Sequence, residues 1–194
     1  MTRTMRLLLP LMIGSLWGQS IDLRMEPAQT EVHYMVDSTL HTVHGTFKLK
    51  RGDIVLDPAT GKASGELVVD AASGDSGSGA RDHRMSNSIL ESGKYPEIVF
   101  RPDRVQGQVA PSGHSDVQLH GMFRLHGEDH ELLVPVAVDA DGNGYHAVAK
   151  FTVPYIKWGL KNPSTLFLRV SDTVEITVNA VARPATLQST VLHP

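Results

Sequence analysis

The 194-residue chain contains no cysteine. Without thiols it has no disulfide, no thiol nucleophile, no cysteine-ligated zinc site and no lipid-modified cysteine to anchor it to a membrane. A basic excess is also missing, because 18 Lys and Arg stand against 21 Asp and Glu. A nucleic-acid-binding protein needs a clustered basic surface. The composition therefore argues against nucleic acid as a partner.

Long apolar runs are scarce as well. One short run, residues 7–13, follows Arg3 and Arg6 and precedes the small residues that end at Ser20. A basic start, a short apolar stretch and a small-residue cleavage signal are typical of a secretory signal peptide, which we predict over residues 1–20. The run is too short for a spanning helix, which needs about 20 apolar residues.

The rest of the chain is expected to form one exported domain over residues 21–183, followed by a disordered tail over residues 184–194. It has no second apolar run of spanning length, so we expect a periplasmic or secreted protein that does not span a membrane. About 170 residues suffice for one domain with a sizeable core.

Apolar and polar residues alternate along most of this domain, which is typical of strands with one buried face. Strands and helices do not alternate along the chain, so an all-β antiparallel sheet of about eight strands is expected. A sandwich and a barrel both fit. Short turns and in-strand glycines on the apolar face, Gly45 and Gly121, favour the barrel. The alternating segments are 31–36, 42–50, 64–70, 95–101, 117–125, 131–138, 145–153 and 173–181.

Glycine and proline mark the breaks between these strands. Turns are predicted at Gly52-Asp53 and over residues 57–61, and the glycine-rich stretch 73–79 is predicted to be a loop. Residues 80–91 carry apolar positions at helical spacing and form the one credible helix. Gly93 is expected to end it in the left-handed conformation.

Polar groups offer little catalytic chemistry. Ten histidines suggest a metal site, and His120, His126 and His130 are the tightest group. They lack the spacing of a metal site on one strand or helix, so we interpret them as solvent-facing. No serine lies in a nucleophile elbow, and the Glu128-Asp129 pair is expected at a solvated turn. We therefore expect no enzyme, no metal and no cofactor.

Several ordered motifs nevertheless resemble one family. The most specific is Arg81-Asp82-His83-Arg84-Met85 followed by Lys94-Tyr95-Pro96-Glu97-Ile98-Val99-Phe100. Supporting motifs are His44-Gly45-Thr46-Phe47, Leu119-His120-Gly121-Met122-Phe123-Arg124-Leu125-His126-Gly127, and the strand from Phe151 that leads to Trp158-Gly159. Together they resemble the YceI-like family of lipid-binding proteins over about residues 31–181.

The sequence departs from the family pattern at two places. The family usually has a proline soon after the His-Gly pair. Here residues 128–132 follow His126-Gly127, and the proline comes only at Pro135. The loop over residues 75–79 is longer and richer in glycine than is usual. Both changes fall where they can reshape the mouth of the barrel.

The resemblance implies a lipocalin-like barrel that encloses a long apolar chain, and it carries over no catalytic residue. A packed core without a cavity stays open as an alternative. Arg81 is either the partner of Asp82 in an ion pair or the contact for a lipid headgroup. Tyr155 and Trp158 either plug a barrel mouth or touch the ligand. The residues expected to line a cavity are Tyr34, Val43, Phe47, Leu67, Val69, Met85, Leu90, Phe100, Phe123, Leu125, Val134, Val136, Phe151 and Trp158.

The function expected from this resemblance is transport or storage of one long-chain lipid, such as an isoprenoid quinone, a polyprenyl-like molecule or a fatty acyl chain. Three alternatives are a structural or stress-related barrel without ligand, a lipid-modifying enzyme, and a metal scavenger acting through its histidines. A homodimer is left open.

Overall fold

A computed structural model describes residues 20–185 of the chain. The predicted signal peptide, apart from Ser20, lies outside this range, as do residues 186–194 of the predicted tail. Within the described range, no helix is long and apolar enough to cross a membrane.

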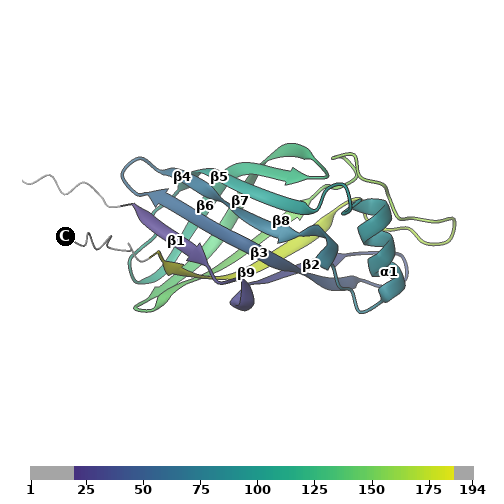
Figure 1. Ribbon diagram of the computed structural model, residues 1–194, viewed down its shortest axis with the longest axis horizontal. Helices are drawn as coiled ribbons and strands as arrows, with labels where there is room; N and C mark the ends of the chain where they lie inside the picture. Colours follow the sequence, from purple (N-terminus) through teal and green to yellow (C-terminus); the bar gives the residue numbers. More distant parts are fainter. Residues whose placement is uncertain (1–19, 186–194) are drawn as a thin grey trace, which may run out of the picture.

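The strands pair antiparallel, and each pairs with the next strand along the chain except the first two, which do not pair with each other (Figure 1). The last strand also pairs with the first two, and this pairing closes the sheet. The strands are β1 (Ile21–Met25), β2 (Glu31–Val36), β3 (Val43–Asp57), β4 (Lys62–Asp70), β5 (Glu97–Gln106), β6 (Gly113–Leu125), β7 (Glu128–Asp141), β8 (Gly144–Val153) and β9 (Val174–Pro184).

β1 and β2 together occupy one position in the wall. Both lie between β3 and β9, and only the short turn η1 (Pro27–Gln29) separates them. The nine strands therefore form an eight-position barrel. The predicted all-β antiparallel barrel is confirmed, and the sandwich is excluded because the strands of residues 20–185 leave no edge unpaired.

The predicted turn at Gly52-Asp53 is wrong, because both residues lie inside β3. A β-bulge interrupts the register with β4 between Leu49 and Arg51. An extra residue in one strand exchanges the faces of all residues after it. The buried positions of β3 accordingly change from odd numbers before the bulge to even numbers after it. In the sequence, this change of the buried positions from odd to even numbers breaks the alternation in the same way as a turn does.

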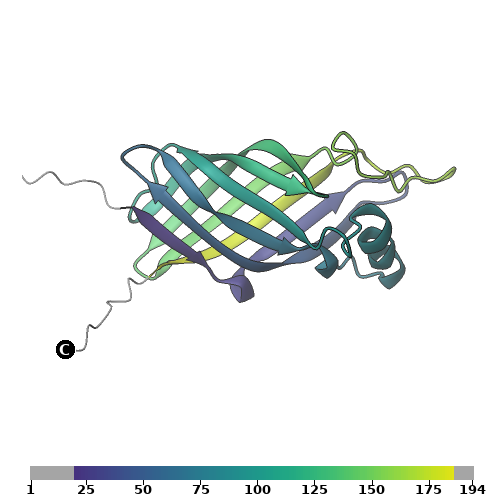
Figure 2. The ribbon, with the colours of Figure 1, turned by 45° about the horizontal axis from the view of Figure 1, so that its top comes forward.

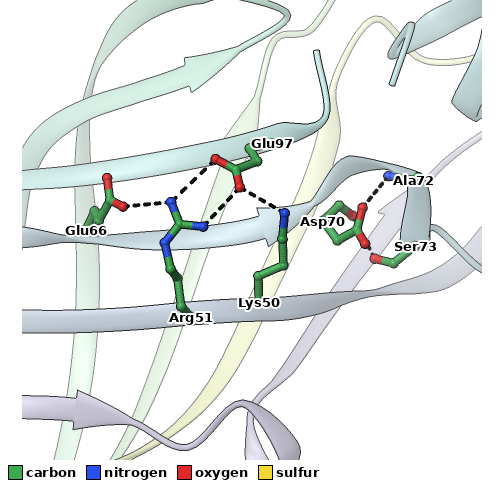
Figure 3. Close-up of polar contacts among 7 residues, drawn as sticks. All are labelled: Lys50, Arg51, Glu66, Asp70, Ala72, Ser73 and Glu97. Atoms are coloured by element: carbon green, nitrogen blue, oxygen red, sulfur yellow. Dashed lines mark hydrogen bonds and ion pairs between the residues drawn. The ribbon is translucent and has the colours of Figure 1, made fainter. Parts of the chain in front are cut away.

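The bulge also assembles an ion cluster on the outer wall (Figure 3). Lys50 and Arg51 both reach Glu97 on β5, at 2.9 and 3.0 Å. Arg51 also pairs with Glu66 on β4 at 3.0 Å. The hydrogen bonds from Arg51 and Lys50 lower the pKa of Glu97 to about 2. These contacts join β3, β4 and β5 close to the place where the chain leaves β4 for the helix.

The two ends of the barrel differ in their connections. At one end the strands are joined by turns at 58–61, 107–112 and 142–143. At the other end the longer segments 37–42, 71–96 and 154–173 extend beyond the strands, and α1 (Gly79–Arg84) lies across that end (Figures 1 and 2). We call this second end the mouth. The His126-Gly127 turn also lies there, and residues 128–132 belong to β7.

The helix predicted over residues 80–91 consists of α1 and the π-helical turn η3 (Met85–Ile89). It ends at Leu90, and Glu91 takes the positive φ of 47° that the sequence suggested for Gly93. The backbone N–H groups of Lys94 and Tyr95 then donate to the Glu91 carbonyl at 2.8 and 2.9 Å. These bonds fix the left-handed conformation of Glu91 at the end of the helix.

Candidate functional site

The barrel interior is packed in one part and hollow in another. The packed part holds a cluster of buried side chains that includes Leu23, Ile54, Leu56, Phe100 and Val138. Towards the mouth, an apolar cavity of about 610 Å³ opens. Its walls are the mouth ends of the strands, α1 with η3, and the segments 37–42 and 154–173. The lining residues are Tyr34, Val36, Ser38, His41, Val43, Phe47, Ser78, Ala80, Arg81, Arg84, Met85, Ile89, Leu90, Ile98, Leu125, Val153, Tyr155, Leu160, Pro163, Leu168, Val170, Val174 and Ile176.

The structure brings together six of the residues expected to line a cavity, and Arg81 with them. The six are Tyr34, Val43, Phe47, Met85, Leu90 and Leu125. The other eight lie outside the cavity. Seven of these belong to or pack against the buried cluster that fills the barrel: Leu67, Val69, Phe100, Phe123, Val134, Val136 and Phe151. Their side chains face inward as expected, but neighbouring side chains already fill the space around them.

Trp158 is the eighth, and it closes one side of the mouth. Its ring stacks on His130 with a centroid separation of 4.1 Å and an interplanar angle of 4°. It also lies 5.8 Å from the ring of Phe123. His130 is therefore not solvent-facing, as the sequence suggested. It points into the barrel, where its Nε2 is buried without a hydrogen-bond partner.

Tyr155, by contrast, lines the cavity. Its hydroxyl donates to the Ser171 carbonyl at 2.6 Å, and burial raises the pKa of Tyr155 to about 12. The bond ties the start of the 154–173 segment to its end. Tyr155 thus fixes the wall of the cavity and has no free polar group to offer a ligand.

The rim of the cavity carries positive charge. Arg81 and Arg84 line it from α1, and no carboxylate does so within the described residues. The expected Arg81–Asp82 ion pair does not form. Asp82 Oδ1 instead accepts from the backbone N–H and the hydroxyl of Ser76, at 2.9 and 2.5 Å, because it turns towards the loop that precedes the helix. In residues 20–185 neither guanidinium takes part in an ion pair.

Tyr34 is the second polar feature of the cavity. The residue is only 6% exposed, and its hydroxyl oxygen is buried without a hydrogen-bond partner. Burial raises the pKa of Tyr34, and the nearby Ser76 side chain and, more weakly, the charge of Arg81 act in the opposite direction. A buried hydroxyl without a partner costs about 1–3 kcal/mol. This oxygen has no surface open to the cavity, so a ligand can reach it only after a local rearrangement.

Backbone hydrogen bonds attach the 71–96 segment, which contains the helix, to the barrel wall. Thr46 on β3 and Asp75 exchange backbone hydrogen bonds of 2.8 and 2.9 Å. A side chain at Gly45 would collide with the Asp75 carbonyl oxygen and the Tyr34 ring. The sequence suggested that Gly45 allows the barrel wall to bend. In the structure, Gly45 allows the loop at Asp75 to approach β3 closely.

A second set of contacts, centred on Glu91, lies just after the helix. Glu91 contacts His126 Nε2 at 2.7 Å and Lys161 Nζ at 3.3 Å. The hydrogen bonds from His126 and then Lys161 lower the pKa of Glu91. His126 also lies against the Tyr95 ring, with centroids 4.2 Å apart. These contacts join three segments of the mouth and explain why His126 is half-buried instead of solvent-facing.

Sequence reasoning missed much of the 154–173 segment. Leu160, Pro163, Leu168 and Val170 line the cavity, but they follow no strand or helix period. Their apolar character between two polar stretches was the available signal. Val36, Val153 and Ile176 were also missed, although the same alternation that identified Tyr34 places them inward.

The described residues offer no clear metal site. Within residues 20–185, no group of three or more His, Asp or Glu side chains is arranged to hold a metal ion. His120 lies on the outer wall between Asp103 at 2.6 Å and Glu131 at 2.7 Å. These two carboxylates raise the pKa of His120. The arrangement is an ion-pair network of the wall.

Comparison with solved structures finds the same barrel in proteins from several bacteria. BcnA of Burkholderia cenocepacia aligns with a TM-score of 0.68 and 18% identity, over 81% of this chain and 98% of that one. A polyisoprenoid binding domain from Saccharophagus degradans aligns with a TM-score of 0.63 and 13% identity, over 85% and 99%. The YceI protein of Campylobacter jejuni aligns with a TM-score of 0.53 and 13% identity, over 95% and 93%. At these identities the likeness shows the fold alone.

No curated protein matches the chain in sequence. The model of the YceI-like domain, however, matches residues 23–182, which is nearly the whole described range. The match begins in β1 and ends in β9, so it includes every strand of the barrel and the helix at its mouth. This chain therefore belongs to the YceI-like domain family, as its motifs suggested.

Proposed function

We propose that the protein binds one amphipathic lipid with a single long apolar chain and carries or stores it outside the cytoplasm. The cavity at the mouth carries this proposal. Its volume lies in the usual range of small-molecule sites, and its walls are mostly aliphatic and aromatic. The polyisoprenoid binding domain from Saccharophagus degradans, which shares the fold, supports an isoprenoid-like or fatty acyl chain as the ligand.

The charged rim of the cavity indicates which headgroup the ligand carries. Arg81 and Arg84 lie at the cavity, and neither has an ionic partner within residues 20–185. Guanidinium groups bind phosphate and carboxylate strongly. The apolar chain then lies in the cavity, while an anionic headgroup meets the cations at the rim. This makes Arg81 the headgroup contact, together with Arg84.

The packed half limits how far the chain can enter. Residues such as Phe100, Val134 and Val136 fill the barrel beyond the cavity. A long isoprenoid must therefore fold back or leave part of its length at the mouth. The proposal is a binding function without catalysis, because the acid-free and mostly apolar lining offers no acid–base pair.

Lipid extraction from natively purified protein, followed by mass spectrometry, tests the proposal. We expect one dominant lipid in the wild type and a loss of it in Ile176→Trp, which fills the cavity from β9. Val148→Trp, on the outer wall at 40% exposure, is the matched control and should keep the lipid. Absence of lipid in the wild type, or equal lipid in Ile176→Trp, would contradict the proposal.

Export is part of the same proposal and rests on the leader-like residues 1–20. Amino-terminal sequencing of protein recovered from the periplasm or the medium should find a new terminus between residues 18 and 21. An intact amino terminus on protein that stays in the cytoplasm would refute export without affecting lipid binding.

A further inference from the structure

We infer that the mouth of the barrel docks on an anionic phospholipid membrane through an apolar tip formed by Leu40, Leu166 and Phe167. The inference goes beyond the proposed lipid binding, because it concerns an outer surface and not the cavity. Leu166 and Phe167 are each 88% exposed, and Leu40 is 74% exposed. Among the described residues these are the most exposed large apolar side chains.

The three side chains belong to one structural unit. The segments 37–42 and 160–173 are joined by an isolated β-bridge between Ser38 and Val170. Thr39 N–H donates to the Arg169 carbonyl at 2.9 Å, which places Leu40 beside the longer segment. Figures 1 and 2 both show this longer segment projecting beyond α1, along the axis of the barrel.

The end of the projection suits the membrane interface. Thr165 N–H donates to the Leu168 carbonyl at 2.8 Å, and Leu168 N–H donates to the Thr165 hydroxyl at 3.2 Å. Backbone groups on either side of the tip are thus paired within the protein, which lowers the cost of taking the tip out of water. Leu166 and Phe167 lie between them and present aliphatic and aromatic groups to the acyl boundary.

Charge favours the same orientation. The segments at the mouth, 37–42, 71–96, 126–127 and 154–173, hold six Lys and Arg against five Asp and Glu. The rest of the described chain holds ten against sixteen. Arg84 and Arg169 are exposed at the mouth, and neither takes part in an ion pair within residues 20–185. An anionic membrane attracts this end and repels the other.

The position of the tip gives the docking a consequence. Leu168, one residue after Phe167, lines the cavity. Insertion of Phe167 therefore brings the cavity opening to the acyl boundary, and a lipid chain can move between bilayer and barrel with little exposure to water. A membrane, and not a protein partner, fits because the tip is small and projecting, and because Arg84 and Arg169 at the mouth take part in no ion pair within residues 20–185.

Vesicle flotation tests the inference with protein purified as the cell processes it. We expect the wild type to bind phosphatidylcholine vesicles weakly, and those that also contain phosphatidylglycerol more strongly. The double variant L166S/F167S should bind both at least about ten-fold more weakly, since it removes two apolar anchors. R169Q should reduce the preference for anionic vesicles about five-fold and leave binding to phosphatidylcholine unchanged. L133S, at an outer-wall leucine 46% exposed, is the matched control and should bind as the wild type does.

A depth measurement complements flotation. In F167W, fluorescence from the new indole should be quenched by phospholipids brominated on their acyl chains, above the quenching seen with the wild type. Equal flotation of wild type and L166S/F167S, or no flotation of the wild type, overturns the inference. A dimer in sedimentation velocity that L166S/F167S abolishes, without vesicle binding, would assign the tip to a second copy instead. Lipid extraction needs no vesicles, so the cavity proposal and the docking inference can fail separately.

Discussion

The division of the barrel into a packed half and a hollow half predicts different costs for one and the same substitution. Leu56 belongs to the packed cluster, and Leu125 lines the cavity. Both residues are 5% exposed and both lie on strands. Leu→Ala removes three carbon atoms in each case. The two variants are therefore matched in chemistry and burial, and they differ in what surrounds the lost atoms.

The magnitudes follow from two terms. Loss of three buried carbons costs about 2.4 kcal/mol, at about 0.8 kcal/mol for each. At Leu56 the packed neighbours leave a new cavity, which brings the total to about 4 kcal/mol. At Leu125 one side already faces the void, so fewer contacts are lost and the total stays near 2 kcal/mol. The difference of about 2 kcal/mol corresponds to about 4–8 °C in Tm for a domain of this size.

Thermal unfolding of lipid-free protein measures this difference. Lipid must be removed first, because a bound ligand adds stability that depends on its concentration and affinity. We expect L56A to melt about 4–8 °C below L125A, and L125A to keep its capacity for lipid. Equal melting temperatures would refute the division, since they would mean that both leucines lie in equally dense surroundings.

Three further predictions concern single groups. Gly45→Ala should cost about 1–3 kcal/mol in urea unfolding, because the new methyl group would displace the Asp75 backbone from β3. Tyr34→Phe should leave the free energy of unfolding of the lipid-free protein unchanged or raise it by about 1 kcal/mol in urea unfolding, because the hydroxyl is buried without a hydrogen-bond partner. It should leave lipid affinity in a titration unchanged, because that hydroxyl has no surface open to the cavity. The hydrogen bond from His120 to Asp103, and then the one to Glu131, raise the pKa of His120 above its ordinary value of 6.5. The charged form of His120 therefore stabilises the fold fully below pH 6.5, and this contribution is lost as the pH rises through the folded-state pKa. His120→Gln should remove that part of the pH dependence of Tm.

The wall of the barrel was largely predictable because each strand has one buried face. Alternation locates such strands directly, and a chain in which helices do not alternate with the strands favours antiparallel neighbours. β1 escaped notice, although Leu23 and Met25 alternate with Asp22 and Arg24. It is only five residues long and lies next to the leader-like segment. The bulge in β3 was hidden for another reason, since an insertion of one residue and a turn break the alternation in the same way.

The cavity was less predictable than the wall. Alternation states which face of the sheet a side chain occupies, but not its height along the barrel axis. Phe47 and Phe100 are both inward-facing aromatic residues, yet Phe47 lines the cavity and Phe100 belongs to the packed cluster. Whether a given height is filled depends on side chains from all eight wall positions at that height. The register between strands determines this, and one sequence does not reveal it.

The location of the void at the mouth follows from how each end is closed. A layer of side chains inside a barrel fills its cross-section when every wall position contributes an inward residue at that height. Towards the turns at 58–61, 107–112 and 142–143 this condition is met. At the mouth the chain leaves the wall in three long segments, so the barrel is capped by helix and loop residues such as Met85 and Leu168 instead of by strands. These helix and loop residues cover the opening, and the cavity lies between them and the packed part of the barrel. The packed half supplies the stability that allows the mouth to keep an apolar void, whose lining side chains lack packing partners until a ligand occupies the site.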